Sequence, residues 1–311
     1  MHIVVFGAGA VGGYFGGRLA KAGAPVTFLV REKRGRELMQ RGLRAHSVHG
    51  DFVVEHPRLA RSVAELASPQ LVILAVKNYH LNSVLPQLRE LVGQGAKVLP
   101  LLNGVEHIRV LKKALGVDAV LGGACYIEAT LNAEGDIVHT SPMHDVVFGS
   151  ISGGEDDEFL TELASQFERS GVNVKQSPQI MRDIWQKYLF LATFSAITAA
   201  TRKPIGETLS DPVTHQFLEE LVAEAVTVGQ AYESTLPANT LDMVLNKFQA
   251  VAPSMTSSLH RDLEKGLPLE LDSLQGAMID MGAARAIQTP NMRALYALLH
   301  PYRDGARRTG P

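Results

Sequence analysis

The first residues whose type and spacing could do chemistry are small ones close to the N-terminus. They form a G-x-G-x-x-G motif of Gly7, Ala8, Gly9, Ala10, Val11 and Gly12. The apolar run His2–Phe6 precedes the motif and a segment with helical periodicity follows it, which makes the pattern specific. The first glycine permits a tight turn, the second lets the backbone approach a phosphate, and the third allows close helix–strand packing. The motif therefore predicts a dinucleotide site at a helix N-terminus, the alternative being a glycine-rich turn without a ligand.

Basic residues follow the second predicted strand, Pro25–Val30. The first of them is Arg31, and Lys33 and Arg34 come soon after it. An NAD-binding chain usually has a carboxylate here for the ribose 2′-hydroxyl, whereas a cation suits the 2′-phosphate of NADP. Arg31 therefore favours NADP, with NADPH as its reduced form. Glu32 leaves NAD open, and a solvated helix start is the alternative without a ligand.

Two further polar residues follow predicted strands. Lys77 comes after Leu71–Val76, and Asn103 comes after Lys97–Leu102. Ligands of doubly wound sheets bind at the carboxyl ends of the strands, so both side chains are candidates for a cofactor or a substrate carboxylate. A surface lysine and a simple Asn-Gly turn are the alternatives.

Positioning these residues requires a parallel sheet, which the first half of the chain predicts by alternating apolar runs with helical segments. The remaining predicted strands are Ala119–Ala129, Val146–Ser150 and Val172–Lys175, and the predicted helices are Val11–Ala22, Glu32–Arg41, Val84–Leu91, Ile108–Leu115 and Glu158–Ser170. Asn132, Gly135 and Asp136 predict a hairpin turn, so the far edge of the sheet is expected to be antiparallel. A Gly- and acid-rich loop is expected at 152–157.

The pattern changes near Pro178, after which strand-like runs stop. Helical periodicity takes over in Ile180–Thr201, Pro212–Glu233, Leu241–Val251, Leu269–Ala286 and Asn291–Leu299. We therefore expect an α/β fold of two domains: 1–177, a Rossmann-like doubly wound sheet that binds NADP, and 178–311, an all-α domain that binds substrate. We expect the active site in a cleft between them, since such clefts are favoured ligand sites.

Composition excludes several classes of protein. The 311 residues carry 46% hydrophobic and 20% charged side chains, with a net charge of −2. This charge indicates neither nucleic acid nor a membrane surface as partner. The single cysteine, Cys125, permits no internal disulfide and fits a core thiol in the cytoplasm. The 11 histidines show no metal-ligand spacing, so no metal site is expected.

Several motifs in order carry a resemblance to a known family. They are GAGAVGG at the start, LAVK ending at Lys77, LLNG with Asn103, IWQKYLF with Lys187, and SSLHRDLEKGLPLELDSLQG at 257–276. The series resembles the ketopantoate reductases (2-dehydropantoate 2-reductases) over nearly the whole chain. The resemblance implies a fold of the 6-phosphogluconate-dehydrogenase type. It also implies reduction of ketopantoate to pantoate by NADPH, in pantothenate biosynthesis.

The resemblance also implies roles for single residues. Lys187 matches the family's general acid, and Asn103 its asparagine after the fifth strand. Ser258 and Glu270 match its late serine and glutamate. The cofactor-binding lysine and arginine match Lys77 and Arg31. By pattern alone Lys187 could equally be a surface cation, Glu270 one carboxylate of an amphipathic helix, and Ser258 a helix cap.

One departure from the family concerns the substrate. The family commonly has asparagines four and eight residues after its lysine, where this chain has Leu191 and Ser195. Leu191 cannot hydrogen-bond a substrate hydroxyl, and Ser195 is shorter than asparagine, so discrimination for a hydroxylated substrate should weaken. The reaction type, reduction of a 2-keto acid with Lys187 as proton donor, is unaffected.

Alternative functions are a family member that reduces a different 2-keto acid and a non-enzymatic NADP-binding sensor. His107 could lie near the pocket, although lone histidines are common on loops. The helical domain has apolar faces that would allow a homodimer.

Overall fold

The computed structural model describes residues 1–152 and 158–306, which form two compact units. Unit 1 holds Met1–Leu102 and His107–Asp183; unit 2 holds Asn103–Glu106 and the chain from Ile184 onward. The expected boundary after residue 177 thus differs from the observed one, which falls inside helix α6 (Ile180–Thr201). The first turn of α6 stays with unit 1, where Ile180 packs at the glycines of two strands. The loop expected at 152–157 lies, apart from Ser152, outside the described residues.

A five-stranded parallel sheet forms the centre of unit 1. Its strands are β1 (Ile3–Phe6), β2 (Val26–Leu29), β5 (Arg58–Ala60), β6 (Leu71–Leu74) and β7 (Lys97–Pro100). They lie in the order β5-β2-β1-β6-β7, and every neighbouring pair is parallel. The chain winds outward from β1 in both directions, so the switch point lies between β1 and β6. Ligands of such sheets bind beside the carboxyl ends of the strands there.

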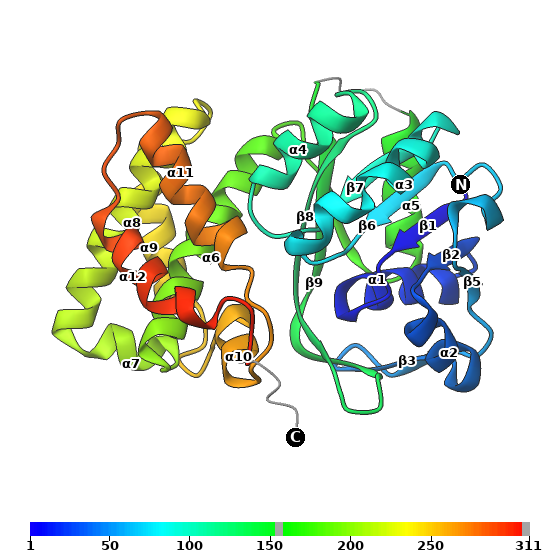
Figure 1. Cartoon of the computed structure of the whole chain (residues 1–311), viewed down its shortest axis with the longest axis horizontal. Coiled ribbons are helices and arrows are strands. Elements are labelled where there is room, and N and C mark those ends of the chain that lie inside the picture. The colour runs from blue at the N-terminus through cyan, green and yellow to red at the C-terminus, as the bar shows by residue number, and fades with distance from the viewer. Residues whose placement is uncertain (153–157, 307–311) are drawn as a thin grey trace. The chain divides into compact units, whose positions relative to one another are not determined.

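Both faces of this sheet are buried, which explains why its strands are apolar throughout. The helices and 3₁₀ turns that precede α6 are α1 (Ala10–Lys21), α2 (Glu32–Arg41), η1 (Val63–Glu65), η2 (Asn78–His80), α3 (Leu81–Gly93), α4 (Glu106–Leu115) and α5 (Glu158–Arg169) (Figure 1). In β1, Ile3 and Val5 join one core cluster with Phe15 and Phe28, while Val4 and Phe6 join another. This alternation follows from the two-residue period of a strand.

A second, mixed sheet completes unit 1. Its strands are β3 (Leu43–Ser47), β4 (Phe52–Val54), β8 (Leu121–Leu131), β9 (Ile137–Ser150) and β10 (Asn173–Gln176). The predicted hairpin is confirmed, because β8 and β9 are antiparallel and Gly135 in their turn has a φ of +82°. The hairpin belongs to this second sheet, where β9 also pairs with β3 and β10, and it adjoins the edge strand β7 of the parallel sheet through a parallel bridge between Val98 and Val120. The short strands β3 and β4, which pack beside α1, were not predicted.

Unit 2 is helical throughout its described residues, which confirms the predicted change of pattern. It contains most of α6, then α7 (Ile205–Ser210), α8 (Pro212–Tyr232), α9 (Thr240–Ala250), α10 (Ser258–Glu264), the π-helical turn η3 (Asp272–Gly276), α11 (Ala277–Ala284), α12 (Pro290–Leu299) and the 3₁₀ turn η4 (His300–Tyr302). The helix expected from Leu269 begins only at the π-helical turn. Within the described chain, no helix has both the length and the apolarity needed to span a bilayer.

Candidate functional site

The glycine motif forms the turn between β1 and α1, and each glycine has the surroundings that its role requires. Gly7 has a φ of +105°, and a Cβ there would lie 2.8 Å from the Ala75 carbonyl oxygen. A Cβ on Gly12 would lie 2.1 Å from the Gly7 carbonyl oxygen, so α1 packs directly onto the turn. A Cβ on Gly9 would meet nothing within 4 Å. The open side of the turn at Gly9 therefore fits a pyrophosphate at the start of α1.

Arg34 supports this turn, a role that the sequence did not reveal. Its Nε donates to the Ala8 carbonyl (3.0 Å), and its Nη1 donates to the Gly135 carbonyl (2.9 Å) and to Glu37 (3.1 Å). The guanidinium thus joins the glycine turn, the β8–β9 hairpin and α2. Planar geometry with several donors suits arginine to such a link. The partners lie 26 and 101 positions away, so no local signal could have found them.

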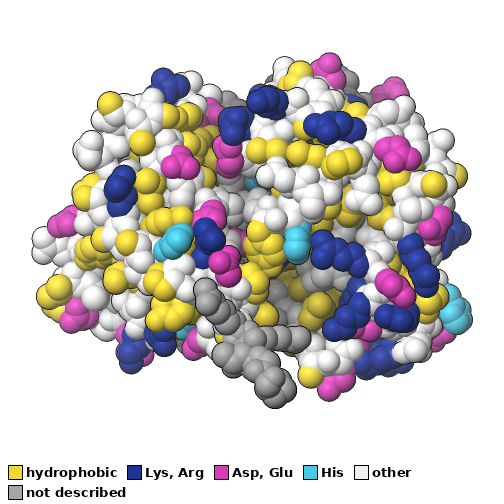
Figure 2. Space-filling model, in the orientation of Figure 1, with side chains coloured by type: hydrophobic (Ala, Val, Ile, Leu, Met, Phe, Trp, Pro, Cys, Tyr) yellow, Lys and Arg dark blue, Asp and Glu magenta, His cyan; other side chains and the backbone are white. Residues whose placement is uncertain are grey.

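The cations of the predicted 2′-phosphate site lie at the start of α2. Arg31 is the N-cap residue of α2, and both it and Lys33 are exposed. In Figure 2, Lys and Arg side chains gather over the region of α2. Burial and, secondarily, the charge of Arg31 lower the pKa of His80 in η2. The turn after β6, where half-buried Lys77 caps η2, therefore lies within electrostatic reach of Arg31.

The catalytic candidates are brought together within unit 2. Lys187, in the second turn of α6, donates from Nζ to Oδ1 of Asn103 over 3.1 Å. The next residue, Gly104, has a φ of +87°, and a Cβ there would lie 2.9 Å from the Ser273 carbonyl oxygen. Only glycine fits this turn without strain, so Gly104 lets Asn103 lie close to the π-helical turn η3. Two predicted residues from distant segments are therefore paired.

Hydrogen bonds between α6 and η3 hold Lys187 in place. The Tyr188 hydroxyl donates to the Leu274 carbonyl over 2.6 Å, and burial raises the pKa of this phenol, which keeps it a donor. Gln275 Nε2 donates to the Ala192 carbonyl and to Ser195 Oγ, both over 2.8 Å. π-Helical turns are frequent at functional sites. Glu270, which is buried, lies just before η3, so its carboxyl group belongs to this same part of unit 2.

The remaining predicted substrate residues have different surroundings. Leu191 is partly exposed one turn after Lys187, whereas Ser195 is fully buried and its hydroxyl bonds Gln275. Ser258 is partly exposed at the first position of α10. The alternative that Ser258 caps this helix is wrong, because the Ser257 hydroxyl accepts from the His260 N–H over 3.0 Å.

Two other expectations concern buried side chains in unit 1. His107 is buried on α4, a part of unit 1, whereas the Lys187–Asn103 pair belongs to unit 2. Cys125 is buried in β8, as expected of a core thiol. Among the described residues no group of histidine, cysteine and carboxylate side chains is arranged to hold a metal ion.

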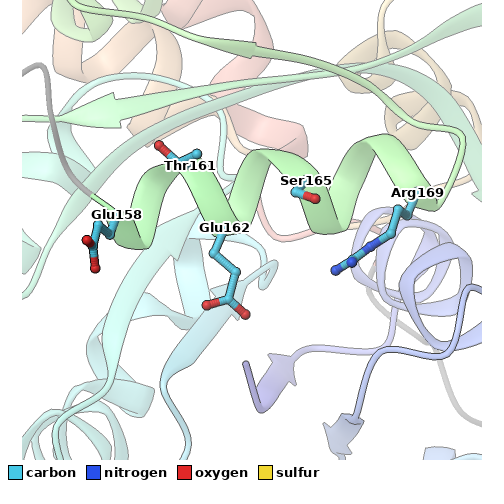
Figure 3. Close-up of a pocket in the computed structure, with 5 residues that line it drawn as sticks. All are labelled: Glu158, Thr161, Glu162, Ser165 and Arg169. Atoms are coloured by element: carbon cyan, nitrogen blue, oxygen red, sulfur yellow. The ribbon is translucent and has the colours of Figure 1, made fainter.

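A hollow of about 530 Å³ lies along α5 of unit 1, and none of these candidates lines it (Figure 3). It is lined by Glu158, Thr161, Glu162, Ser165 and Arg169. All five residues come from one helix, and Glu162 is already paired with the N-terminal amino group at 3.0 Å. The hollow therefore lacks the converging polar groups of a substrate site.

A parallel sheet with a dinucleotide-type glycine turn, followed by a helical unit that holds a lysine–asparagine pair, defines a nucleotide-dependent oxidoreductase. Comparison with known proteins identifies its family. The chain matches the family "Ketopantoate reductase PanE/ApbA" over residues 3–153 and its C-terminal domain over residues 179–303, and it belongs to this ketopantoate reductase family. It is therefore an NADP(H)-dependent oxidoreductase that acts on CH–OH groups.

Individual relatives cover almost the entire chain. The "Uncharacterized oxidoreductase YkpB" of Bacillus subtilis is 36% identical over 97% of this chain and 99% of its own length. A 2-dehydropantoate 2-reductase of Mesorhizobium japonicum is 28% identical over 96% of this chain and 97% of its own. The solved 2-dehydropantoate 2-reductase of Geobacter metallireducens has a TM-score of 0.88 and 25% identity, covering 97% and 99% of the two chains. These likenesses confirm the predicted fold.

Proposed function

We propose that the chain reduces a 2-keto acid to the 2-hydroxy acid with NADPH, and that Lys187 is the general acid. Ketopantoate is the first candidate substrate, since several relatives are named 2-dehydropantoate 2-reductases. The hydrogen bond between Lys187 and Asn103 is the observation that carries this proposal. It gives an ammonium group a defined direction on a helix that Tyr188 and Gln275 hold in place.

Lys187 performs the proton chemistry in this proposal. Its Nζ would donate a hydrogen bond to the keto oxygen and transfer a proton as negative charge develops there. The positive charge would stabilise that oxygen before transfer. The Asn103 amide oxygen accepts from Nζ and so orients the ammonium group.

The residues of unit 1 would bind the cofactor. The N–H groups at the start of α1 and the open face of Gly9 fit the pyrophosphate, and Arg31 and Lys33 fit a 2′-phosphate. When bound, NADPH supplies the hydride. The exposed cations at α2 support a preference for NADPH over NADH.

The second candidate substrate is a 2-keto acid with an apolar side chain. Leu191 lies one turn after Lys187 and offers only methyl groups, and the Ser195 hydroxyl is buried against Gln275. Neither residue thus offers a polar group for a substrate hydroxyl. Solved structures of D-mandelate dehydrogenase share the fold with a TM-score of 0.84, but at 22% identity they support the fold alone.

The test is the rate of NADPH oxidation, followed by its near-ultraviolet absorbance, with ketopantoate beside plain and branched 2-keto acids. Highest kcat/KM on ketopantoate supports the first candidate, and highest kcat/KM on an apolar keto acid supports the second. Lys187→Ala should lower kcat by about 10²- to 10⁴-fold and leave NADPH binding unchanged. Lys203→Gln is the matched control, since this exposed lysine of unit 2 pairs with the exposed Glu207 at 2.9 Å. Tight NADPH binding without turnover on any keto acid would favour the sensor.

A further inference from the structure

The first turn of α1 is held by backbone contacts at two adjacent glycines. A Cβ on Gly12 would lie 2.1 Å from the Gly7 carbonyl oxygen, and a Cβ on Gly13 would lie 2.8 Å from Cδ1 of Ile137 on β9. The glycines allow this close approach, but they supply no side chain that could fix the rotation of the helix about its axis. Tyr14, the next residue, carries the first ring of α1.

The side chain of Tyr14 joins α1 to two strands of the second sheet. It is fully buried, and its ring centroid lies 4.7 Å from that of His139 on β9 and 5.9 Å from that of Phe52 on β4. Its hydroxyl lies 3.1 Å from Nδ1 of His144, which is also buried and also on β9. Ring packing and a buried polar contact therefore act on the same side chain.

The polar contact between Tyr14 and His144 has a defined direction. Burial lowers the pKa of His144 to about 4, so its ring is neutral at neutral pH. A neutral imidazole has one nitrogen that accepts, and the Tyr14 hydroxyl can donate to it. Ser47 Oγ lies 3.4 Å from the same hydroxyl. The hydroxyl is thus confined from two strands, and the helix that carries it is confined with it.

The N–H groups at the start of α1 can bind a pyrophosphate only when they point at it, and their direction changes when the helix turns about its axis. We propose that Tyr14 is a positioning residue for the cofactor, which through His144 fixes the rotation of α1 and so directs these N–H groups. This assignment rests on the proposed placement of the pyrophosphate at the open side of Gly9. Without the hydrogen bond α1 would populate several rotations, and the apparent affinity would fall with the fraction that can bind.

The test measures two ligands by isothermal titration on the full-length protein. NADPH has both the pyrophosphate and the 2′-phosphate, whereas adenosine 2′-phosphate lacks the pyrophosphate. Tyr14→Phe should raise the Kd for NADPH about three- to tenfold, the range set by the net free energy of one hydrogen bond. It should change the Kd for adenosine 2′-phosphate by less than about twofold, because that ligand has no group for the start of α1. A general loss of stability would not separate the two ligands, since both bind the folded chain.

Variants of His144 test whether the hydrogen bond itself is responsible. His144→Leu removes the acceptor and should raise the Kd for NADPH as Tyr14→Phe does. The double variant should show no further loss, because both substitutions break the same bond. His144→Gln offers an amide oxygen as acceptor and should keep the Kd for NADPH within about threefold of the wild-type value.

Two controls separate positioning from folding. Ser170→Ala removes a buried hydroxyl at the end of α5 that donates to the Phe167 carbonyl over 2.6 Å. It should lower the melting temperature about as much as Tyr14→Phe and leave both Kd values unchanged. Tyr232→Phe makes the same chemical change in unit 2, where the hydroxyl donates to the Met281 carbonyl over 3.1 Å, and should also leave both Kd values unchanged.

The outcomes distinguish this assignment from the placement of the pyrophosphate. If Gly9→Ala weakens NADPH binding, but Tyr14→Phe has no effect or weakens both ligands equally, the assignment of Tyr14 is wrong and the pyrophosphate site stands. If Gly9→Ala leaves NADPH binding unchanged, the pyrophosphate lies elsewhere and the assignment of Tyr14 fails with it.

Discussion

Lys187 Nζ donates to Asn103 Oδ1 over 3.1 Å although 84 positions separate the two residues in the chain. Asn103 reaches this place because Gly104 turns with a positive φ against Ser273. The pair thus joins the end of a parallel strand's loop to the first long helix of unit 2. The hydrogen bond predicts that Asn103 orients the ammonium group of Lys187.

Asn103→Ala should lower kcat by about 10- to 100-fold, because it removes a hydrogen bond to a charged group that directs the ammonium. NADPH affinity, measured by fluorescence titration, should stay unchanged. The exposed Asn239→Ala is the control. An unchanged kcat with a raised KM for NADPH would instead assign Asn103 to the cofactor, the other role that the sequence predicts for it.

Gly9 and Gly12 should respond differently to the same substitution. Gly9→Ala adds a methyl group to open space, so the melting temperature should hold while NADPH affinity falls at least about tenfold. Gly12→Ala should destabilise the fold itself by about 1–3 kcal/mol, because its Cβ would lie 2.1 Å from the Gly7 carbonyl oxygen. Wild-type NADPH affinity in Gly9→Ala would show that no pyrophosphate lies there.

Substitution of Arg31 and of Arg34 should change the KM values for NADPH and NADH in different ways. Arg31→Ala should raise the KM for NADPH about tenfold and leave that for NADH unchanged, because only NADPH has the 2′-phosphate. Arg34→Ala should raise both KM values, because Arg34 supports the Ala8 carbonyl of the glycine turn. The exposed Arg36→Ala is the control. Equal effects of Arg31→Ala on both cofactors would contradict a phosphate site there.

Leu191→Asn restores the residue type expected from the family at this position. The variant should shift the ratio of kcat/KM for ketopantoate over an unhydroxylated 2-keto acid by about tenfold toward ketopantoate, because an amide can bond a substrate hydroxyl. Ser195→Asn should fail to do the same, since Ser195 is fully buried against Gln275. A ratio unchanged by Leu191→Asn would place the substrate's side chain elsewhere.

A histidine cluster in unit 1 gives the protein a pH-dependent stability. The His144 ring stacks on His49 with centroids 3.7 Å apart, and its Nδ1 is 3.1 Å from the Tyr14 hydroxyl. Burial and, secondarily, the charge of His49 lower the pKa of His144 from 6.5 to about 4. Burial also lowers the pKa of His139, whose Nδ1 bonds Ser47.

The unfolded chain therefore takes up these protons at a higher pH than the folded chain. The free energy of unfolding should fall as the pH drops from about 6.5 toward 4, and the contribution of His144 should level off below that. Urea unfolding at a series of pH values measures this slope. His144→Gln should flatten it, whereas the exposed His56→Gln should not; an equal slope in all three proteins would contradict the lowered pKa of His144.

The dinucleotide turn could be predicted because its signal, three spaced glycines after an apolar strand, lies within one short segment of the sequence. Gly7 and Gly12 mark places where a side chain would clash, Gly9 marks a place where the backbone stays open to a phosphate, and the apolar strand before them makes the pattern specific. Arg34 could not be found in this way, because its carbonyl partners become neighbours only when the hairpin folds over α2. Likewise, neighbouring serines 257 and 258 are indistinguishable as caps until backbone geometry selects one.

The length of a helix or strand explains most of the remaining differences between the predicted and the observed elements. The helix Ile180–Thr201 was predicted at its observed bounds because many residues contribute to its pattern. Strands β3 and β4 are too short to give such a pattern, although Leu43 and Ala45 alternate with exposed residues. The π-helical turn η3 is bonded to α6 through Leu274, which accepts from Tyr188, and through Gln275, which donates to Ala192; the sequence alone does not place these contacts.

The segment Asn103–Glu106 belongs to unit 2 although the chain before and after it belongs to unit 1. Unit 2 is therefore encoded by two separate stretches of the gene. A single recombination near residue 184 between two relatives would combine the lysine of one parent with the asparagine of the other. An exchange keeps the two residues together only where its breakpoint lies outside 103–187, so the two positions should evolve together despite their distance along the gene.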